Sequence, residues 1–140
     1  MDLLMFHLDN INWVAVLIAT VFSYAIGGLW YSQALFGKVW MKEIGLKPKD
    51  MQSAKMTRTF AATGVLAFTS ATGLAVLMKA LEFDTWQQGL VFGVIVSVAF
   101  AATSRGIHML FEQKGLTLFL INALHDVVFL AVAGLIIGAL

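Results

Sequence analysis

The chain has 140 residues, of which 60% are hydrophobic and only 12% are charged, and its formal net charge is +1. Soluble domains contain about 45–50% apolar and about 25% charged residues, so this composition excludes an ordinary soluble enzyme and indicates one membrane domain over residues 1–140. The sequence contains no cysteine, which excludes disulfide bonds and thiolate metal sites. The nearly balanced charge gives no reason to expect a nucleic-acid partner.

Four apolar segments are long enough to cross a bilayer, because about 20 apolar residues suffice. Membrane-spanning helices are expected over residues 11–35, 56–81, 86–111 and 116–139. These segments predict an all-α fold, a four-helix transmembrane bundle. No basic residue precedes the first apolar segment, so we do not expect a cleaved signal peptide. His7 lies ahead of the first span and is expected to be solvated.

The first loop, residues 36–55, is the longest connection between two spans. From Phe36 to Leu46 it mixes bulky apolar residues with lysines, as does an amphipathic helix that lies on an anionic membrane surface. Pro48 suits the first turn of a helix and not its interior, so a new helix is expected to begin there. The loop therefore predicts a short interfacial helix, which serves as a topology anchor, a gate or a partner surface.

Positive charges concentrate in the first and third loops. The residues concerned are Lys38, Lys42, Lys47, Lys49, Lys55 and Arg58 around the first loop and Lys114 in the third. Because cytoplasmic loops carry an excess of Lys and Arg, both loops are expected in the cytoplasm. Both termini are then expected on the periplasmic or extracellular side.

Small residues recur every four positions in three spans, which lets helix backbones approach closely in lipid. The rows are Ala15, Ala19, Ser23 and Gly27; Thr63, Ala67, Ala71 and Ala75; and Gly89, Gly93, Ser97 and Ala101. Gly134 and Gly138 repeat the spacing in the fourth span. That pair serves either the bundle itself or a contact between copies of the chain, for which a dimer is favoured.

The last span carries an acidic residue, Asp126, close to its middle. An ionised Asp at the centre of a membrane helix costs at least ~2.5 kcal/mol, so it requires a partner. Arg105 in the third span is the best partner, because a hairpin folded about Lys114 brings residue 105 level with residue 123. At ~1.5 Å rise per residue the depths of Arg105 and Asp126 differ by about 5 Å, which an arginine side chain can reach.

Other polar residues lie close to this predicted pair. Asn122 and His125 stand at i and i+3 relative to Asp126 at i+4, so all three share one side of the helix, and His108 follows Arg105 by three residues. His125 can change protonation near physiological pH, which suits a proton-coupled or anion-handling site. A structural clamp between two helices would contain the same residues.

No enzymatic reading is supported by the sequence. The familiar catalytic motifs are absent, and the turn geometry does not bring Glu112 deep enough to complete a metal site with His108, His125 and Asp126. We therefore expect no metal, no cofactor and no catalytic residue.

Three sequence motifs lie at and after the first span. They are Asn12-Trp13-Val14-Ala15-Val16, Gly27-Gly28-Leu29-Trp30-Tyr31-Ser32 and Leu35-Phe36-Gly37-Lys38-Val39-Trp40-Met41. In them the chain resembles a bacterial family of small membrane proteins, domain of unknown function 1761. The resemblance covers essentially the full length and implies a four-span protein of the bacterial inner membrane, without an assigned activity.

The aromatic residues of these motifs also have a physical reading. Rings such as Trp30 and Tyr31 favour the headgroup level, and Gly27 and Gly28 beside them can open a cavity lined by all four residues. As function the sequence favours a small oligomeric transporter or channel with its site at Arg105, His108, Asn122, His125 and Asp126. The alternative is a structural or assembly protein, and in both cases membrane lipids are partners.

Overall fold

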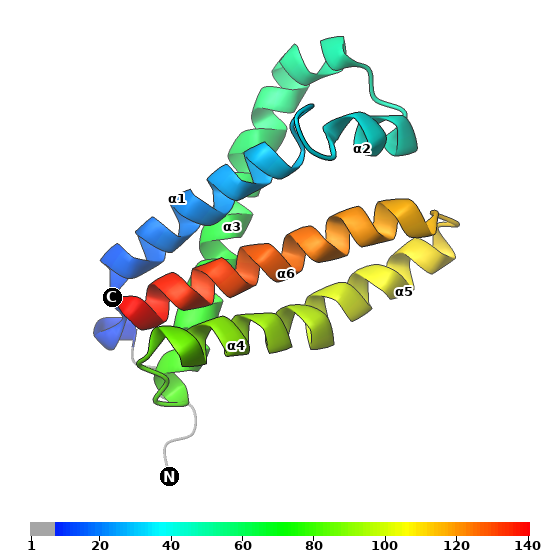
Figure 1. Cartoon of the computed structure of the whole chain (residues 1–140). Coiled ribbons are helices and arrows are strands. Elements are labelled where there is room, and N and C mark those ends of the chain that lie inside the picture. Colours follow the sequence, from blue (N-terminus) through cyan, green and yellow to red (C-terminus); the bar gives the residue numbers. More distant parts are fainter. Residues whose placement is uncertain (1–7) are drawn as a thin grey trace.

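The computed structural model describes residues 8–140, so His7 lies outside the described part. This part is helical and contains no β-strand, which confirms the all-α prediction (Figure 1). In chain order the elements are the 3-10 helix η1 (Leu8–Asn10), α1 (Trp13–Trp30), α2 (Gly37–Ile44), the 3-10 helix η2 (Pro48–Gln52), α3 (Ala54–Ala80), α4 (Trp86–Val96), the π-helix η3 (Ser97–Ala102), α5 (Thr103–Phe111) and α6 (Leu116–Ala139).

Four of the helices are long and apolar enough to cross a membrane. They are Trp13–Trp30, Ala54–Ala80, Trp86–Phe111 and Leu116–Ala139. The first ends five residues earlier than predicted, because the chain turns after Trp30. In that turn the N–H of Phe36 donates to the carbonyl of Trp30 at 3.0 Å, and the N–H of Gly37 donates to the carbonyl of Ser32 at 2.8 Å.

The first loop contains the predicted short helix, α2, and a helical turn that begins at Pro48, η2. This turn does not continue into the second span, because Ser53 is extended with φ −72° and ψ 155°. The hydroxyl of Ser53 accepts a hydrogen bond from the N–H of Met56 at 3.1 Å. Ser53 therefore acts as the N-cap that starts α3.

Helix α6 packs on α1, α3 and α4, whereas α4, η3 and α5 together form the third span, antiparallel to α6 (Figure 1). The side-chain amide of Asn12 donates to the carbonyl of Leu140 at 3.3 Å, so the start of α1 and the end of α6 lie together. At the other end, Glu43 of α2 lies beside Gly115. The lysine-rich loops therefore share the end of the molecule opposite to the end of α6.

Most small residues of the predicted four-residue rows lie in helix interfaces, whereas Thr63 in the second row is exposed. Ala15, Ala19 and Ser23 of α1 are buried, and so are Ala67, Ala71 and Ala75 of α3. The hydroxyl of Ser23 donates across the interface to the carbonyl of Phe129 in α6 at 3.2 Å.

The closest approach joins α4 to α6. A Cβ atom added at Gly89 would meet the backbone of Gly134, and one at Gly93 would meet the backbone of Leu130. Gly138 in turn lies against the backbone of Thr85. Of the two roles that the sequence allowed for Gly134 and Gly138, the structure shows the one inside the bundle, where both are buried.

Candidate functional site

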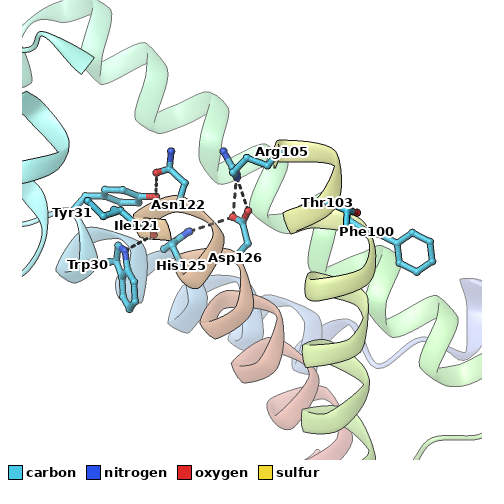
Figure 2. A network of polar contacts seen from close by, with 9 residues as sticks. All are labelled: Trp30, Tyr31, Phe100, Thr103, Arg105, Ile121, Asn122, His125 and Asp126. Atoms are coloured by element: carbon cyan, nitrogen blue, oxygen red, sulfur yellow. Dashed lines mark hydrogen bonds and ion pairs between the residues drawn. The ribbon is translucent and has the colours of Figure 1, made fainter. Parts of the chain in front are cut away.

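Arg105 and Asp126 are in direct contact across the third and fourth spans (Figure 2). Nε of Arg105 donates to Oδ2 of Asp126 at 2.8 Å, and Nη2 donates to Oδ1 at 3.1 Å. Two parallel hydrogen bonds of this kind are the strong form of the arginine–carboxylate pair. The two spans are therefore joined by a directional charged contact inside their apolar length.

Arg105 and Asp126 lie at different depths along their helices, and the direction of helical side chains explains how their charged groups still meet. Every Cα–Cβ bond in a helix tilts toward the N-terminus of that helix. The third and fourth spans are antiparallel, so Arg105 leans away from the connecting loop and Asp126 leans toward it. The two side chains converge.

The π-helix η3 decides which face of the third span presents Arg105. In a regular α-helix each residue advances by about 100°, so a step of four residues overshoots a full turn by about 40°. Three such steps lead from Gly93 to Arg105, and a continuous α-helix would therefore turn Arg105 about 120° away from Gly93. The wider i→i+5 turn of a π-helix advances less per residue, and therefore returns Arg105 toward the face that packs on α6. The hydroxyl of Thr103 donates to the carbonyl of Ala99 at 2.7 Å and lies 3.2 Å from the carbonyl oxygen of Phe100, beside this wider turn. Figure 2 shows Thr103 next to Phe100.

His125 lies beside the pair, and three aromatic side chains surround its imidazole. Its Nδ1 is 3.6 Å from Oδ1 of Asp126. Its ring centroid lies 5.1 Å from that of Tyr31, 6.2 Å from that of Trp30 and 6.0 Å from that of Phe129. On the far side of the ring, Nε2 is buried and has no hydrogen-bond partner in the part of the chain that the structure describes.

Gly27 provides the room for this imidazole. A Cβ atom added at Gly27 would lie 3.1 Å from Nε2 of His125, whereas one at Gly28 would meet nothing within 4 Å. Of the two glycines proposed to line a cavity, Gly27 thus lies against His125, and Gly28 lies in open space.

Two further hydrogen bonds fasten the end of α1 to α6 (Figure 2). The hydroxyl of Tyr31 donates to Oδ1 of Asn122 at 2.8 Å, and Nε1 of Trp30 donates to the carbonyl of Ile121 at 3.0 Å. The structure therefore brings Trp30, Tyr31, Asn122, His125 and Asp126 together around α6. His108 is exposed on α5, and its imidazole makes no hydrogen bond or ion pair with any residue from 8 to 140.

The pair is more open on the arginine side. The side chain of Arg105 is 39% exposed, whereas those of Asp126 and His125 are 16% and 17% exposed. A guanidinium has five N–H donors, and Asp126 accepts from two of them. Figure 2 shows the outer nitrogens of Arg105 and the amide nitrogen of Asn122 directed to the same side. This side offers hydrogen-bond donors and suits an anion.

Metal binding has no comparable support. Within residues 8–140 no group of three or more His, Asp or Glu side chains is arranged to hold a metal ion. Asp126 and His125 stand next to a guanidinium, which competes for the same carboxylate.

The fold and the pair together define a small helical membrane protein with a charged contact between its third and fourth spans. The chain belongs to the family described as protein of unknown function DUF1761, whose model matches residues 14–138. No curated protein and no solved structure matches the chain.

Removal of the Tyr31 hydroxyl tests the contact between α1 and α6. Tyr31→Phe leaves the carbonyl oxygen of Asn122 without its donor, so we expect the free energy of unfolding to fall by about 0.5–1.5 kcal/mol. Tyr24→Phe is the matched control, because the hydroxyl of Tyr24 donates to the carbonyl of Phe60 at an exposed position. Thermal unfolding in detergent measures both variants, and equal losses would contradict a special role for Tyr31.

Proposed function

We propose that this protein is a small transporter or channel of the bacterial inner membrane that binds a small anion at Arg105. The proposal is supported by the position, the exposure and the unused hydrogen-bond donors of the Arg105 guanidinium. It lies within a membrane-spanning segment, it is 39% exposed, and three of its five N–H donors have no acceptor among residues 8–140. An ionisable group inside a span is expensive, and such groups commonly mark substrate or ion pathways.

The distribution of charge supports access from the cytoplasm. The loops that contain α2 and the turn between α5 and α6 carry most of the lysines, and the positive-inside rule assigns such loops to the cytoplasm. Arg105 lies six residues before Phe111, which places it about 9 Å from that end of the span. A ligand from the cytoplasm reaches Arg105 before the middle of the bilayer, and both termini face the opposite side.

The neighbours of Arg105 supply a way to couple an anion to a proton. In the empty site Asp126 neutralises Arg105. An arriving anion competes for the guanidinium and leaves Asp126 facing Nδ1 of His125, 3.6 Å away. Uptake of a proton by this carboxylate and imidazole together then compensates the freed negative charge. Four spans packed through small residues leave little internal room, so conduction through a wide path requires several copies, and a dimer is the simplest.

Flux measurements on the purified chain in liposomes test this proposal. We expect uptake of radiolabelled phosphate or succinate above that of protein-free liposomes, with a rate that depends on the pH difference. Arg105→Gln should reduce uptake to the protein-free level, and Asp126→Asn should leave the protein folded but remove the pH dependence. Lys49→Gln is the control for a cation outside the span. The proposal fails if neither anion enters faster than in protein-free liposomes, or if Arg105→Gln transports like the unmodified chain.

A structural role is the second candidate, and a specific observation favours it. The pair has two parallel hydrogen bonds and a carboxylate that is only 16% exposed, which is the geometry of a clamp between helices. In a clamp, Asp126→Asn chiefly lowers the thermal stability and no anion flux is present.

A further inference from the structure

A groove lies where the end of α1 and the start of α2 face the first half of α6. One wall consists of Trp30, Phe36 and Val39, and the other consists of Leu120, Ile121 and Leu124. Thr117 closes the end nearest the loop between α5 and α6, and the volume is about 320 Å³. Nε1 of Trp30 is already bonded to the carbonyl of Ile121. The groove therefore offers almost only hydrocarbon to an occupant.

The size of the groove limits what can occupy it. An extended hydrocarbon chain is only one methylene group wide, so part of such a chain can lie in an apolar groove of about 320 Å³. Leu120 and Leu124 are 45% and 51% exposed, and Val39 is 45% exposed, so the groove is open along the outside of the bundle. In a bilayer that outside is acyl chains.

The end of the groove nearest the loops carries cations. Lys42 follows Val39 by three residues on α2, and Lys114 precedes Thr117 by three residues. The two segments meet, because Oε2 of Glu43 lies 3.8 Å from the position of a Cβ atom on Gly115. Both lysines are exposed, and neither forms an ion pair with any residue that the structure describes.

Two further features of this end favour an anion. No side chain of the described residues caps the start of α6 at Gly115. A helix N-terminus has free N–H groups and attracts negative charge. Residues 36–58 and 112–115 contain seven Lys or Arg and three acids, which is a net charge of 7 − 3 = +4. The three acids are Glu43, Asp50 and Glu112.

From the groove and its charged end together we infer a phospholipid site. One acyl chain lies along Leu120 and Leu124, and the phosphate lies between Lys42 and Lys114. A phospholipid combines an anionic phosphate with hydrocarbon chains in the arrangement that this site requires. Its phosphate stands at the membrane surface, and its chains run inward along α6. Neither the groove nor the lysines take part in the proposed anion pathway, so this inference does not depend on it.

The bound lipid would also support the charged site. Trp30 and Ile121 line the groove, and the ring of Trp30 lies 6.2 Å from that of His125. An acyl chain in the groove therefore holds the indole against the imidazole, on the side of the bundle that is otherwise open.

Native mass spectrometry of the purified full chain, titrated with phosphatidylglycerol or phosphatidylethanolamine, measures this site directly. We expect one saturable lipid per chain with either headgroup, since the phosphate is common to both. The double variant Lys42→Gln with Lys114→Gln should weaken binding roughly tenfold or more, because each lysine near a phosphate is worth about a factor of five. Lys49→Gln with Lys55→Gln removes the same charge from η2 and the start of α3 and should change binding less than twofold.

A second pair of variants tests the groove itself. Leu120→Trp fills it and should abolish the saturable lipid, whereas Leu110→Trp places the same ring at an exposed position of α5, outside the groove. If both double lysine variants weaken lipid binding equally, the lipid is held by diffuse charge attraction and the inference is wrong. Retained binding in Leu120→Trp, or a change of oligomer mass in place of lipid loss, would overturn it as well.

Discussion

Gly134→Ala should destabilise the protein by about 1–3 kcal/mol, the usual cost of overpacking a close interface. The added methyl group would overlap the backbone of Gly89 on α4, and a backbone atom cannot move aside as a flexible side chain can. Helices α4 and α6 would have to separate along the interface that also contains Gly93 and Gly138. Thermal or denaturant unfolding in detergent gives the free energy difference.

Gly73→Ala is the matched control for this prediction, and the expected sign is opposite. A Cβ atom at Gly73 would meet nothing within 4 Å, so the exchange adds no clash. Alanine is favoured over glycine in a helix by about 0.8–1.0 kcal/mol. We therefore expect Gly73→Ala to be neutral or stabilising, and two variants with similar losses would show that the contact between Gly89 and Gly134 is not the cause.

The sequence was sufficient to predict the spans and the joining of Arg105 to Asp126. Both follow from regular geometry, because the rise per residue and the short turn at Lys114 fix the depth of each residue in a helical hairpin. The end of the first span was wrong by five residues, since Trp30 to Phe36 carries no charge and only Ser32 and Gln33 interrupt its apolar and aromatic residues. Only the hydrogen bonds of the turn stop the helix there.

The sequence did not predict the π-helix at Ser97–Ala102. This segment contains no proline and no glycine, so no residue marks a break in the regular helix. Steps of four residues lead from Gly93 to Arg105, but on a regular α-helix each step overshoots a full turn by about 40°. The residue reaches that face because the wider turn offsets the drift, a compensation that only the three-dimensional structure shows.

The surroundings of His125 were only partly predictable. Asn122 and Asp126 are one helical turn apart, so their nearness to His125 follows from spacing. The position of Gly27 against Nε2 of His125 depends on how α1 crosses α6, and no spacing within one helix contains that information. The same holds for the groove, which needs three separate elements to form its walls.

Asp126→Leu is expected to produce the largest loss of stability among single changes at the site. It removes the acceptor of two hydrogen bonds from Arg105 and leaves a guanidinium without a counter-charge inside a span. Breaking a buried ion pair in this way costs about 3–5 kcal/mol. The lower end of that range applies here, because the side chain of Arg105 is 39% exposed and reaches some solvent or headgroup charge.

The double variant Arg105→Leu with Asp126→Leu should recover most of that loss, since two apolar side chains replace two charges and no unpaired group remains. Replacement of a whole buried pair by apolar residues is often neutral or stabilising. Unfolding of the two single variants and the double variant gives the coupling free energy between the residues. A double variant as unstable as Asp126→Leu alone would show that the pair is not what links the third and fourth spans. A stable double variant that transports no anion would separate the two roles, because the helices then remain joined while the site that would bind the ligand is gone.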